Sequence, residues 1–317
     1  MNYVLQEKHL GDQICSAGLA ASTLASIEKR AGQVTSDIYE NKAIIEDCRI
    51  NAVGGLSSGL HLWETAVIPF VNNNSETWTE LSQCAIDRLE GLQNQFLRAV
   101  LATPKSTPTP ALCWETGTLT MANRIAKNKL LFYHHLLNLE PDTLAYEIAA
   151  IQSELGYPGL MKECNALIVE LRLADIRFKT LSKLQWKKAV SMAIIEKNRA
   201  DLPDNIARNY KKLDFKNYQQ KSLRLRKYIK KNKIEDSRII FQSKSKMMRT
   251  VKMNYKNNPK YIQANWSCSG CSQVDSMEHL LWCDADSSSH LRVGLNLDND
   301  NDLAGYYRNI LKIRAED

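Results

Sequence analysis

The sequence predicts a mainly α-helical protein, with a helical bundle first, a basic helical segment next and a small cysteine-rich module near the end. Apolar residues recur every three or four positions through most of the chain, which is the repeat of a helix that buries one face. Only 13 glycines and 8 prolines occur among 317 residues, which disfavours a turn-rich β architecture. A concentration of positive charge and a run of closely spaced cysteines then distinguish the later part of the chain.

The first elements are predicted from turn residues and apolar spacing. A short hairpin is expected at the start of the chain, with Gly11 and Asp12 in its turn. A helical repeat begins at Leu19, and a mostly buried helix is predicted over Leu56–Phe70, ended by Pro69.

The middle of the chain continues this helical pattern. An amphipathic helix is predicted over Trp78–Leu101, followed by an extended proline-rich linker over residues 103–110. Further helices are predicted at residues 119–139, 144–155, 160–175, 180–198 and 303–314.

Composition limits the classes of protein that fit. With 44% hydrophobic and 24% charged residues, the chain has the composition of a globular protein rather than a disordered one. It has no uncharged apolar stretch of about 18 residues and no secretory signal at its start, so we expect neither a membrane span nor export. We therefore expect an intracellular location, nuclear or cytoplasmic, where the eight cysteines are thiols or metal ligands rather than disulfides.

The net charge of +7 conceals an uneven distribution. Residues 1–176 carry −7, residues 177–260 carry +19 and residues 261–317 carry −5. A basic block between two acidic ones predicts contact with a polyanion, and aromatic rings between the cations can stack on unpaired bases. The alternative is a solvated helical face whose aromatic residues belong to the core. The cations expected to contact RNA or DNA are Lys211, Lys212, Arg224, Arg226, Lys227, Lys230, Lys231 and Lys233, interleaved with Tyr210, Phe215, Tyr218 and Tyr228.

Four residues near the end of the chain have the spacing of a zinc knuckle, namely Cys268, Cys271, His279 and Cys283. Thiolate and imidazole groups suit the tetrahedral coordination of Zn²⁺, and a Cys-x2-Cys pair places two sulfurs on one tight turn. His279 and Cys283 are four residues apart, so on a helix they project from the same face. We therefore predict a structural Zn²⁺ ion. The alternative is a pair of reduced core cysteines beside an unrelated histidine, and His290 is a poorer substitute ligand.

No catalytic residue is predicted. The sequence has no Asp-Asp pair to hold the two Mg²⁺ ions that a polymerase needs, no glycine-rich phosphate loop and no convincing nucleophile with its base. The acidic run of Asp298, Asp300 and Asp302 lacks the glycine and glutamate of a calcium loop, so we interpret it as a solvated segment. His134 and His135 lie in an apolar helical stretch, where packing is the expected role.

Short motifs follow one another along the chain up to the cysteines. They are Lys8-His9-Leu10-Gly11, Trp63-Glu64 with Ile68-Pro69, Leu89-Glu90-x-Leu92-Gln93 with Phe96-Leu97-Arg98, Ser106-Thr107-Pro108 with Glu115-x-Gly117, and Glu278-His279-Leu280-Leu281. In this order they resemble the C-terminal part of LINE-type (non-LTR) retrotransposon reverse transcriptases, which comprises the primer-grip strand, the thumb and a CCHC zinc knuckle. His9 replaces the usual Tyr, and the family more often has four residues between the histidine and the last cysteine.

The resemblance implies a domain organisation and a class of partner. The partner is RNA or DNA or both, and Trp266 and Trp282 would stack on unpaired bases. The implied parts are a primer-grip-like remnant at 1–18, a helical thumb domain at 19–140, an increasingly basic helical region at 141–260, the zinc knuckle at 261–290 and a tail at 291–317.

The resemblance also limits the expected activity. The parent family is RNA-directed DNA polymerase, whose Mg²⁺-binding aspartates would lie upstream of Met1, so that the chain is expected to be a truncated or decayed piece. No activity is therefore expected of this chain alone. Two alternatives stay open: a decayed helical relic without activity, or a polymerase that is active only when joined to an upstream palm. The sequence does not indicate an oligomeric state.

Overall fold

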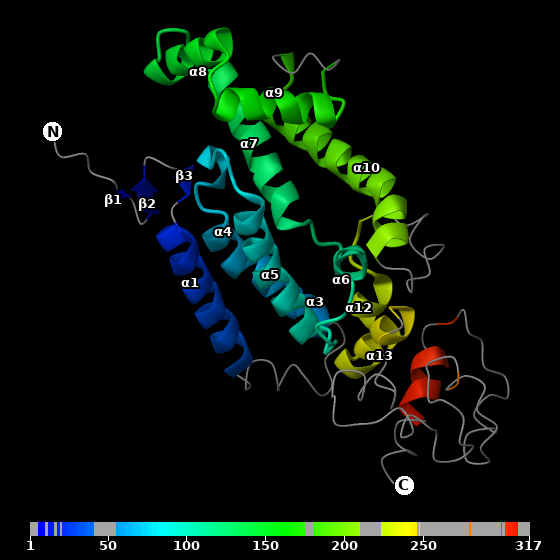
Figure 1. Cartoon of the computed structure of the whole chain (residues 1–317). Helices are drawn as coiled ribbons and strands as arrows, with labels where there is room; N and C mark the ends of the chain where they lie inside the picture. Colours follow the sequence, from blue (N-terminus) through cyan, green and yellow to red (C-terminus); the bar gives the residue numbers. More distant parts are fainter. Residues whose placement is uncertain are drawn as a thin grey trace. The chain divides into compact units, whose positions relative to one another are not determined.

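The structure is a computed structural model, and it confirms the mainly α-helical class. The chain divides into two compact units that interleave along the sequence (Figure 1). The first unit comprises Met1–Glu40, Leu62–Asn94 and Leu119–Asn205, and the second comprises Asn41–His61, Gln95–Thr118 and Ile206–Asp317. The residues described are 6–9, 12–15, 18–19, 21–40, 55–174, 180–209, 223–245, 247, 279, 299 and 302–309.

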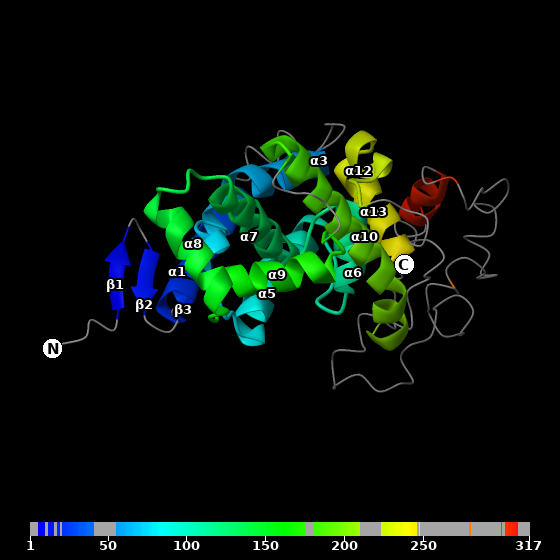
Figure 2. The ribbon, with the colours of Figure 1, turned by 90° about the horizontal axis from the view of Figure 1, so that it is seen from above.

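The first unit begins with three short strands, which the sequence predicts only in part. Strands β1 (Gln6–His9) and β2 (Asp12–Cys15) pair antiparallel and lie side by side in Figure 2, and β3 (Gly18–Leu19) pairs with β2. The predicted hairpin is therefore present. Its predicted turn is wrong by one residue, because Asp12 already pairs with His9 inside the sheet. Leu19 lies in the sheet and not in a helix.

Helices make up the rest of the first unit. Their bounds are α1 at Ala21–Glu40, a π-helical turn at Trp63–Val67, α4 at Ile68–Val71, a 3-10 turn at Ser75–Thr77, the first part of α5 (Gln83–Val100), α7 at Met121–Leu137, α8 at Leu144–Leu155, α9 at Leu160–Glu170 and most of α10 (Lys183–Asn209).

The second unit has shorter helices. They are α3 at Gly55–Leu62, the end of α5, α6 at Thr109–Thr116, α12 at Lys227–Lys231, α13 at Ile234–Lys244 and a helix at residues 302–309.

Several predicted helix ends are wrong, each for a local reason. Pro69 does not end its helix, because it lies in the first turn of α4, where a proline costs no backbone hydrogen bond. The linker predicted over 103–110 is shorter, since α6 starts at Thr109 with Pro110 in its first turn. Helix α5 begins at Gln83 rather than Trp78, and α10 continues to Asn209 rather than stopping at Asn198.

The end of α9 also differs from the prediction, which extended it to residue 175. Leu171 ends the helix, and Arg172 adopts a left-handed conformation with φ of 54°. The Leu173 N–H then donates to the Ile168 carbonyl at 2.8 Å, which satisfies an end-of-helix acceptor in the way that a glycine usually allows.

The core of the first unit lies between α7, α8, α9 and α10. The Trp186 side chain is fully buried, and its indole N–H donates to the Leu130 carbonyl at 2.8 Å. The His134 ring stacks on Trp186 with centroids 5.6 Å apart, and its Nε2 lies 3.1 Å from the Leu181 carbonyl oxygen. His134 therefore packs in the core, as predicted. Helices α7 and α9, on either side of the boundary predicted at residue 140, pack together within this unit.

No helix of the described part of the chain is both long and apolar enough to cross a membrane.

Candidate nucleic-acid interface

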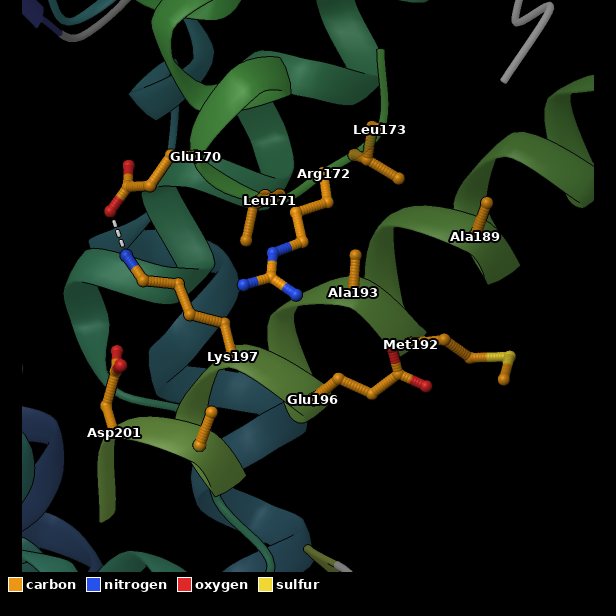
Figure 3. Close-up of a pocket in the computed structure, with 11 residues that line it drawn as sticks. Glu170, Leu171, Arg172, Leu173, Ala189, Met192, Ala193, Glu196, Lys197 and Asp201 are labelled. Carbon is orange, nitrogen blue, oxygen red and sulfur yellow. Dashed lines mark hydrogen bonds and ion pairs between the residues drawn. The ribbon is translucent and has the colours of Figure 1, made fainter. Parts of the chain in front are cut away.

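A cavity of about 640 Å³ lies in the first unit, between the end of α9 and α10 (Figure 3). Leu171, Met192 and several alanines form its apolar lining, and the Arg172 side chain extends into it. At one edge Lys197 pairs with Glu170. Charges of both signs line the cavity, and none of the residues predicted to bind metal or nucleic acid is among them. The predicted interface lies in the second unit instead.

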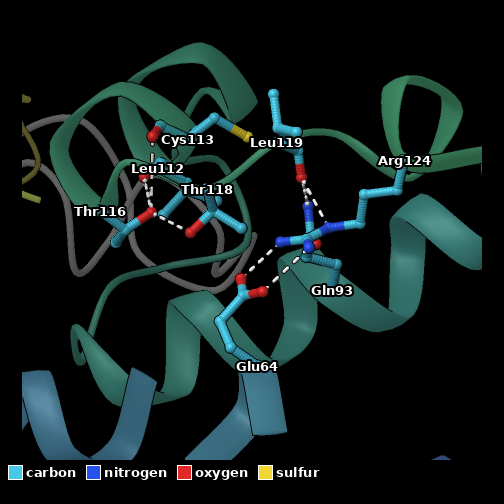
Figure 4. A network of polar contacts seen from close by, with 8 residues as sticks. All are labelled: Glu64, Gln93, Leu112, Cys113, Thr116, Thr118, Leu119 and Arg124. Atoms are coloured by element: carbon cyan, nitrogen blue, oxygen red, sulfur yellow. Dashed lines mark hydrogen bonds and ion pairs between the residues drawn. The ribbon is translucent and has the colours of Figure 1, made fainter. Parts of the chain in front are cut away.

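The C-terminal end of α6 holds residues 224–233, which we call the basic segment. The Thr116 hydroxyl donates to the Leu112 carbonyl at 2.6 Å and lies 2.7 Å from the Thr118 hydroxyl, while the Thr118 N–H donates to the Cys113 carbonyl at 3.0 Å (Figure 4). These bonds fix the turn that holds Gly117 between the two threonines.

Gly117 allows the basic segment to approach this turn closely. Its φ of 71° lies in the left-handed region, which a residue with a side chain rarely adopts. A Cβ atom at this position would lie 2.4 Å from the Leu225 nitrogen and 2.6 Å from the Arg224 carbonyl carbon. The backbone of Arg224 and Leu225 therefore occupies the space that a side chain would need.

Glu115 binds the next residues of the same segment. Its carbonyl accepts the Arg226 N–H at 3.2 Å, and its carboxylate accepts the Tyr228 hydroxyl at 2.9 Å. The same carboxylate oxygen lies 3.8 Å from Arg226 Nε, and only 1% of the Glu115 side chain is exposed. A buried carboxylate needs such partners, so Glu115 fixes both the backbone and the side-chain arrangement of the segment.

Helix α13 is attached to the end of α5. Arg238 Nε donates to the Val100 carbonyl at 2.9 Å, and the Gln242 side-chain amide donates to the Ala102 carbonyl at 2.8 Å. The Ser237 hydroxyl donates to the Tyr228 carbonyl at 2.9 Å, which connects α13 back to α12. Both short helices are thus held on a fixed base.

The apolar residues of the basic segment point inward and most of its cations point outward. Tyr228, Ile229 and Ile234 are buried. The cations that are exposed are Arg224, Lys227, Lys230, Lys231 and Lys233. Among the residues that the structure describes, none of these five makes an ion pair with a carboxylate. We call these five residues the basic surface.

Arg226 and Tyr228 do not belong to the exposed part of the basic block. Arg226 is largely buried and pairs with Glu115, so it positions the segment rather than extending the basic surface. Tyr228 belongs to the core, and Lys244 lies 5.1 Å from the centre of its ring, so it offers no face to a base. Seven other residues predicted to take part lie outside the described residues, namely Lys211, Lys212, Trp266, Trp282, Tyr210, Phe215 and Tyr218.

Only one of the four predicted zinc ligands is described. His279 has helical backbone and is 8% exposed. Cys268, Cys271 and Cys283 lie outside the described residues, and the zinc knuckle stays a prediction. Within the described part of the chain, no group of three His, Cys, Asp or Glu side chains could hold a metal ion.

Sequence reasoning did not assign a role to Glu115 or Gly117 in the interface. Both residues belong to a motif of the resemblance, but their function depends on residues more than a hundred positions away. A glycine directly after a short helix is a recognisable signal for a left-handed helix end. No local signal indicates which distant segment packs on it.

No protein-family model, no curated protein and no solved structure matches this chain. The candidate interface is therefore assigned from the residues and contacts of this chain alone.

Proposed function

We propose that this chain binds nucleic acid through the basic surface and the cysteine-rich module that follows it, as the C-terminal part of a LINE-type retrotransposon reverse transcriptase. One observation carries the proposal. Five exposed cations lie within residues 224–233, on backbone that Glu115 and Gly117 hold in place, and no described carboxylate neutralises them.

The arrangement favours a phosphate backbone over a protein partner. Residues 223–245 contain eight Lys or Arg against two acidic residues, and one of the two, Asp236, pairs with Arg308. Binding of such a surface to a polynucleotide is favourable, because it releases the counterions condensed on the phosphates. Lysine ammonium groups recognise phosphates as point charges and carry no sequence information, so binding should have little sequence preference.

The cysteine-rich module belongs to the same proposal. Three thiolates and one imidazole, from Cys268, Cys271, His279 and Cys283, are a donor set that suits structural Zn²⁺, and the buried position of His279 fits a ligand at the centre of a small module. The ion would supply folding free energy to the module. Trp266 and Trp282 are proposed to stack on unpaired bases.

No catalytic residue is proposed for this chain. If it is part of a reverse transcriptase, RNA-directed DNA synthesis with Mg²⁺ belongs to a palm outside this sequence. The nuclear or cytoplasmic location predicted from the sequence is part of the proposal.

Fluorescence anisotropy with labelled 30-nucleotide single-stranded RNA and duplex DNA of random sequence tests the proposal. We expect the full chain to bind both, with an affinity that falls steeply between 50 and 200 mM salt. The triple variant Lys227→Gln, Lys230→Gln, Lys231→Gln should lower the slope of log affinity against log salt by about 0.7–0.9 per lost phosphate contact. The control Lys105→Gln, Lys162→Gln removes exposed lysines elsewhere and should leave the slope nearly unchanged.

Two results would refute the proposal. One is absence of binding at 50 mM salt, which would favour the relic. The other is an equal effect per removed lysine in the triple variant and in the control, which would show that net charge and not the basic surface is responsible. Metal analysis of the folded chain should give one equivalent of Zn²⁺, and the double variant Cys268→Ser, Cys271→Ser should lose it.

A further inference from the structure

Helix α8 exposes its large apolar residues. Leu144, Ile148, Ile151 and Leu155 are 71%, 47%, 52% and 57% exposed. Their spacing of four, three and four residues places them along one side of the helix, which we call the α8 stripe. The one buried residue of the helix is Ala149, which lies on roughly the opposite side. The helix therefore packs on its own unit through a small residue and presents Leu and Ile to the outside.

Negative charge lies along one edge of the α8 stripe and just before the helix. Asp142, Glu147 and Glu154 are exposed, and residues 141–161 contain no Lys or Arg. An exposed apolar stripe on a protein indicates a binding surface. The charge around this one indicates that its partner is apolar and basic.

Helix α10 of the same unit exposes a face of that kind. Leu184 is 76% exposed and Met192 is 52% exposed, eight residues further along the same side of the helix. Lys188 is exposed between them on the same side, Lys187 is exposed at the edge of that side, and Lys183 is exposed at the first residue of the helix. We call these five residues the α10 stripe. The helix buries its opposite side, which carries Trp186, Val190 and Ile194.

Positive charge is crowded at the α10 stripe. None of Lys183, Lys187 and Lys188 pairs with a carboxylate of the described residues. The pKa of Lys127, on α7, is lowered first by burial and then by repulsion from Lys187 and Arg124. An acidic partner at this face would relieve that repulsion.

We propose that the α8 stripe of one copy of this chain packs on the α10 stripe of a second copy. The two stripes match in apolar character, are opposite in charge and have similar lengths of about 14 to 16 Å at 1.5 Å per residue. Pairing α8 with a second α8, or α10 with a second α10, would place like charges together. The contact is heterologous, so each dimer keeps one free stripe of each kind and can add further copies. This inference does not depend on the proposed function.

Sedimentation velocity of the full chain, treated with nuclease and studied between 1 and 100 µM, tests the inference. We expect the average mass to rise with concentration, and the dissociation constant to increase about tenfold between 50 and 500 mM salt. The variant Ile148→Lys, Ile151→Lys disables the α8 stripe, and Leu184→Glu, Met192→Glu disables the α10 stripe. Each variant alone should stay monomeric.

A mixture of the two variants gives the decisive result. The α8 variant keeps an intact α10 stripe and the α10 variant keeps an intact α8 stripe, so the mixture should form a heterodimer that does not grow further. A wild-type chain that stays monomeric at 100 µM would overturn the inference. So would dimerisation of the α10 variant alone, which indicates a symmetric α8 contact, or association that requires added nucleic acid.

Charge exchange provides a second test that retains all the apolar residues. Glu147→Lys with Glu154→Lys, and separately Lys183→Glu with Lys187→Glu, should each weaken self-association about tenfold or more. A mixture of these two variants should associate, because the altered, basic α8 stripe of one is opposite in charge to the altered, acidic α10 stripe of the other. A chain that carries all four changes should recover self-association for the same reason. Absence of this recovery would contradict the proposed pairing. Circular dichroism spectra of every variant should match the wild type, because all the altered side chains are exposed or half-buried.

Discussion

Arg226 meets Glu115 through both its backbone and its side chain: its N–H donates to the Glu115 carbonyl at 3.2 Å, and its Nε lies 3.8 Å from the Glu115 carboxylate. The Tyr228 hydroxyl donates to the same carboxylate, at 2.9 Å. One buried acidic side chain therefore fixes the start of the segment that carries the basic surface. We therefore expect the Glu115 side chain to determine both the stability of the second unit and the position of the exposed cations.

Replacing Glu115 should destabilise the second unit. Glu115→Ala leaves the Tyr228 hydroxyl without its acceptor and the largely buried Arg226 without its counter-charge, so we expect a loss of about 2–4 kcal/mol in the free energy of unfolding. Urea unfolding measures this loss. Glu140→Gln, at an exposed carboxylate, is the control and should change stability by less than about 0.5 kcal/mol. Equal stability of Glu115→Ala and wild type would show that the buried pair does not hold the segment.

Gly117→Ala tests the close approach of the basic segment to α6. The left-handed backbone costs alanine about 1–2 kcal/mol. The clash of its Cβ with the Leu225 nitrogen adds to this cost, because that nitrogen belongs to the packed backbone and cannot easily move aside. We expect a total loss of about 2 kcal/mol or more, together with weaker RNA binding.

The matched control for this change is Gly91→Ala. Gly91 lies within α5, and a Cβ at this position would have no neighbour within 4 Å. Alanine should therefore stabilise the helix by about 0.5–1 kcal/mol. A Gly117→Ala variant as stable as wild type would contradict the packing of Leu225 on this turn.

Helix α8 shows which parts of the fold local sequence predicts well. Its predicted bounds, 144 to 155, agree with the structure. The Thr143 hydroxyl accepts the Tyr146 N–H at 3.3 Å at the start, and Gly156 ends the helix with φ of 63°. Both signals lie within two or three residues of the ends that they determine, so the sequence alone suffices there.

The start of α5 shows where local prediction fails. Trp78 is apolar and in phase with the helical repeat, yet it lies in a loop that precedes the helix, and its side chain is buried. Glu80 in that loop has φ of 53°, and its N–H donates to the Glu163 carboxylate at 2.6 Å. That carboxylate also pairs with Lys129. The loop is therefore held by α9, 83 residues away along the chain, and no local pattern contains this contact.

The same distinction applies to the candidate site. Charge composition alone predicts that residues 224–233 are basic and that most of their cations reach solvent. It does not predict that Tyr228 is core or that Arg226 is taken up by Glu115, because these outcomes depend on a partner 113 positions away from Tyr228. Of the four aromatic residues interleaved with the predicted cations, the structure describes Tyr228, and that residue belongs to the core.

Glu90→Gln should change the dependence of stability on pH. Burial raises the pKa of Glu90, although the Ala122 N–H donates to its carboxylate at 3.1 Å. The folded chain therefore keeps the Glu90 proton to higher pH than the unfolded chain does, and wild-type stability falls as pH rises through the interval above 4.5. Glutamine retains an acceptor for Ala122 and never ionises, so it does not suffer this loss.

Urea unfolding of Glu90→Gln and wild type between pH 4 and pH 7 measures the effect. The stability of the variant minus that of wild type should increase with pH across this interval. Glu196→Gln, at an exposed carboxylate of α10, should give a difference that stays nearly constant. A difference that decreases with pH would show that the ionised form of Glu90 is the stabilised one.

Cys164 should make the first unit sensitive to alkaline pH. Its side chain is fully buried, its Sγ donates to the Lys129 carbonyl at 3.6 Å, and burial raises its pKa from 9.0 to about 12. The unfolded chain loses this thiol proton near pH 9 while the folded chain retains it, so stability falls as pH rises from about 9 to about 12, by up to about 1.4 kcal/mol per pH unit.

Cys164→Ser isolates this contribution, because its hydroxyl can donate to the same carbonyl and does not titrate in this range. The stability advantage of wild type over Cys164→Ser should be constant from pH 7 to pH 8.5 and then decrease, by about 2 kcal/mol at pH 10.5. Cys84→Ser, at an exposed thiol, should run parallel to wild type. If the Cys164→Ser curve also ran parallel to wild type up to pH 10.5, the thiol would ionise at the same pH in the folded and the unfolded chain. That result would contradict the burial of Cys164 between α7 and α9.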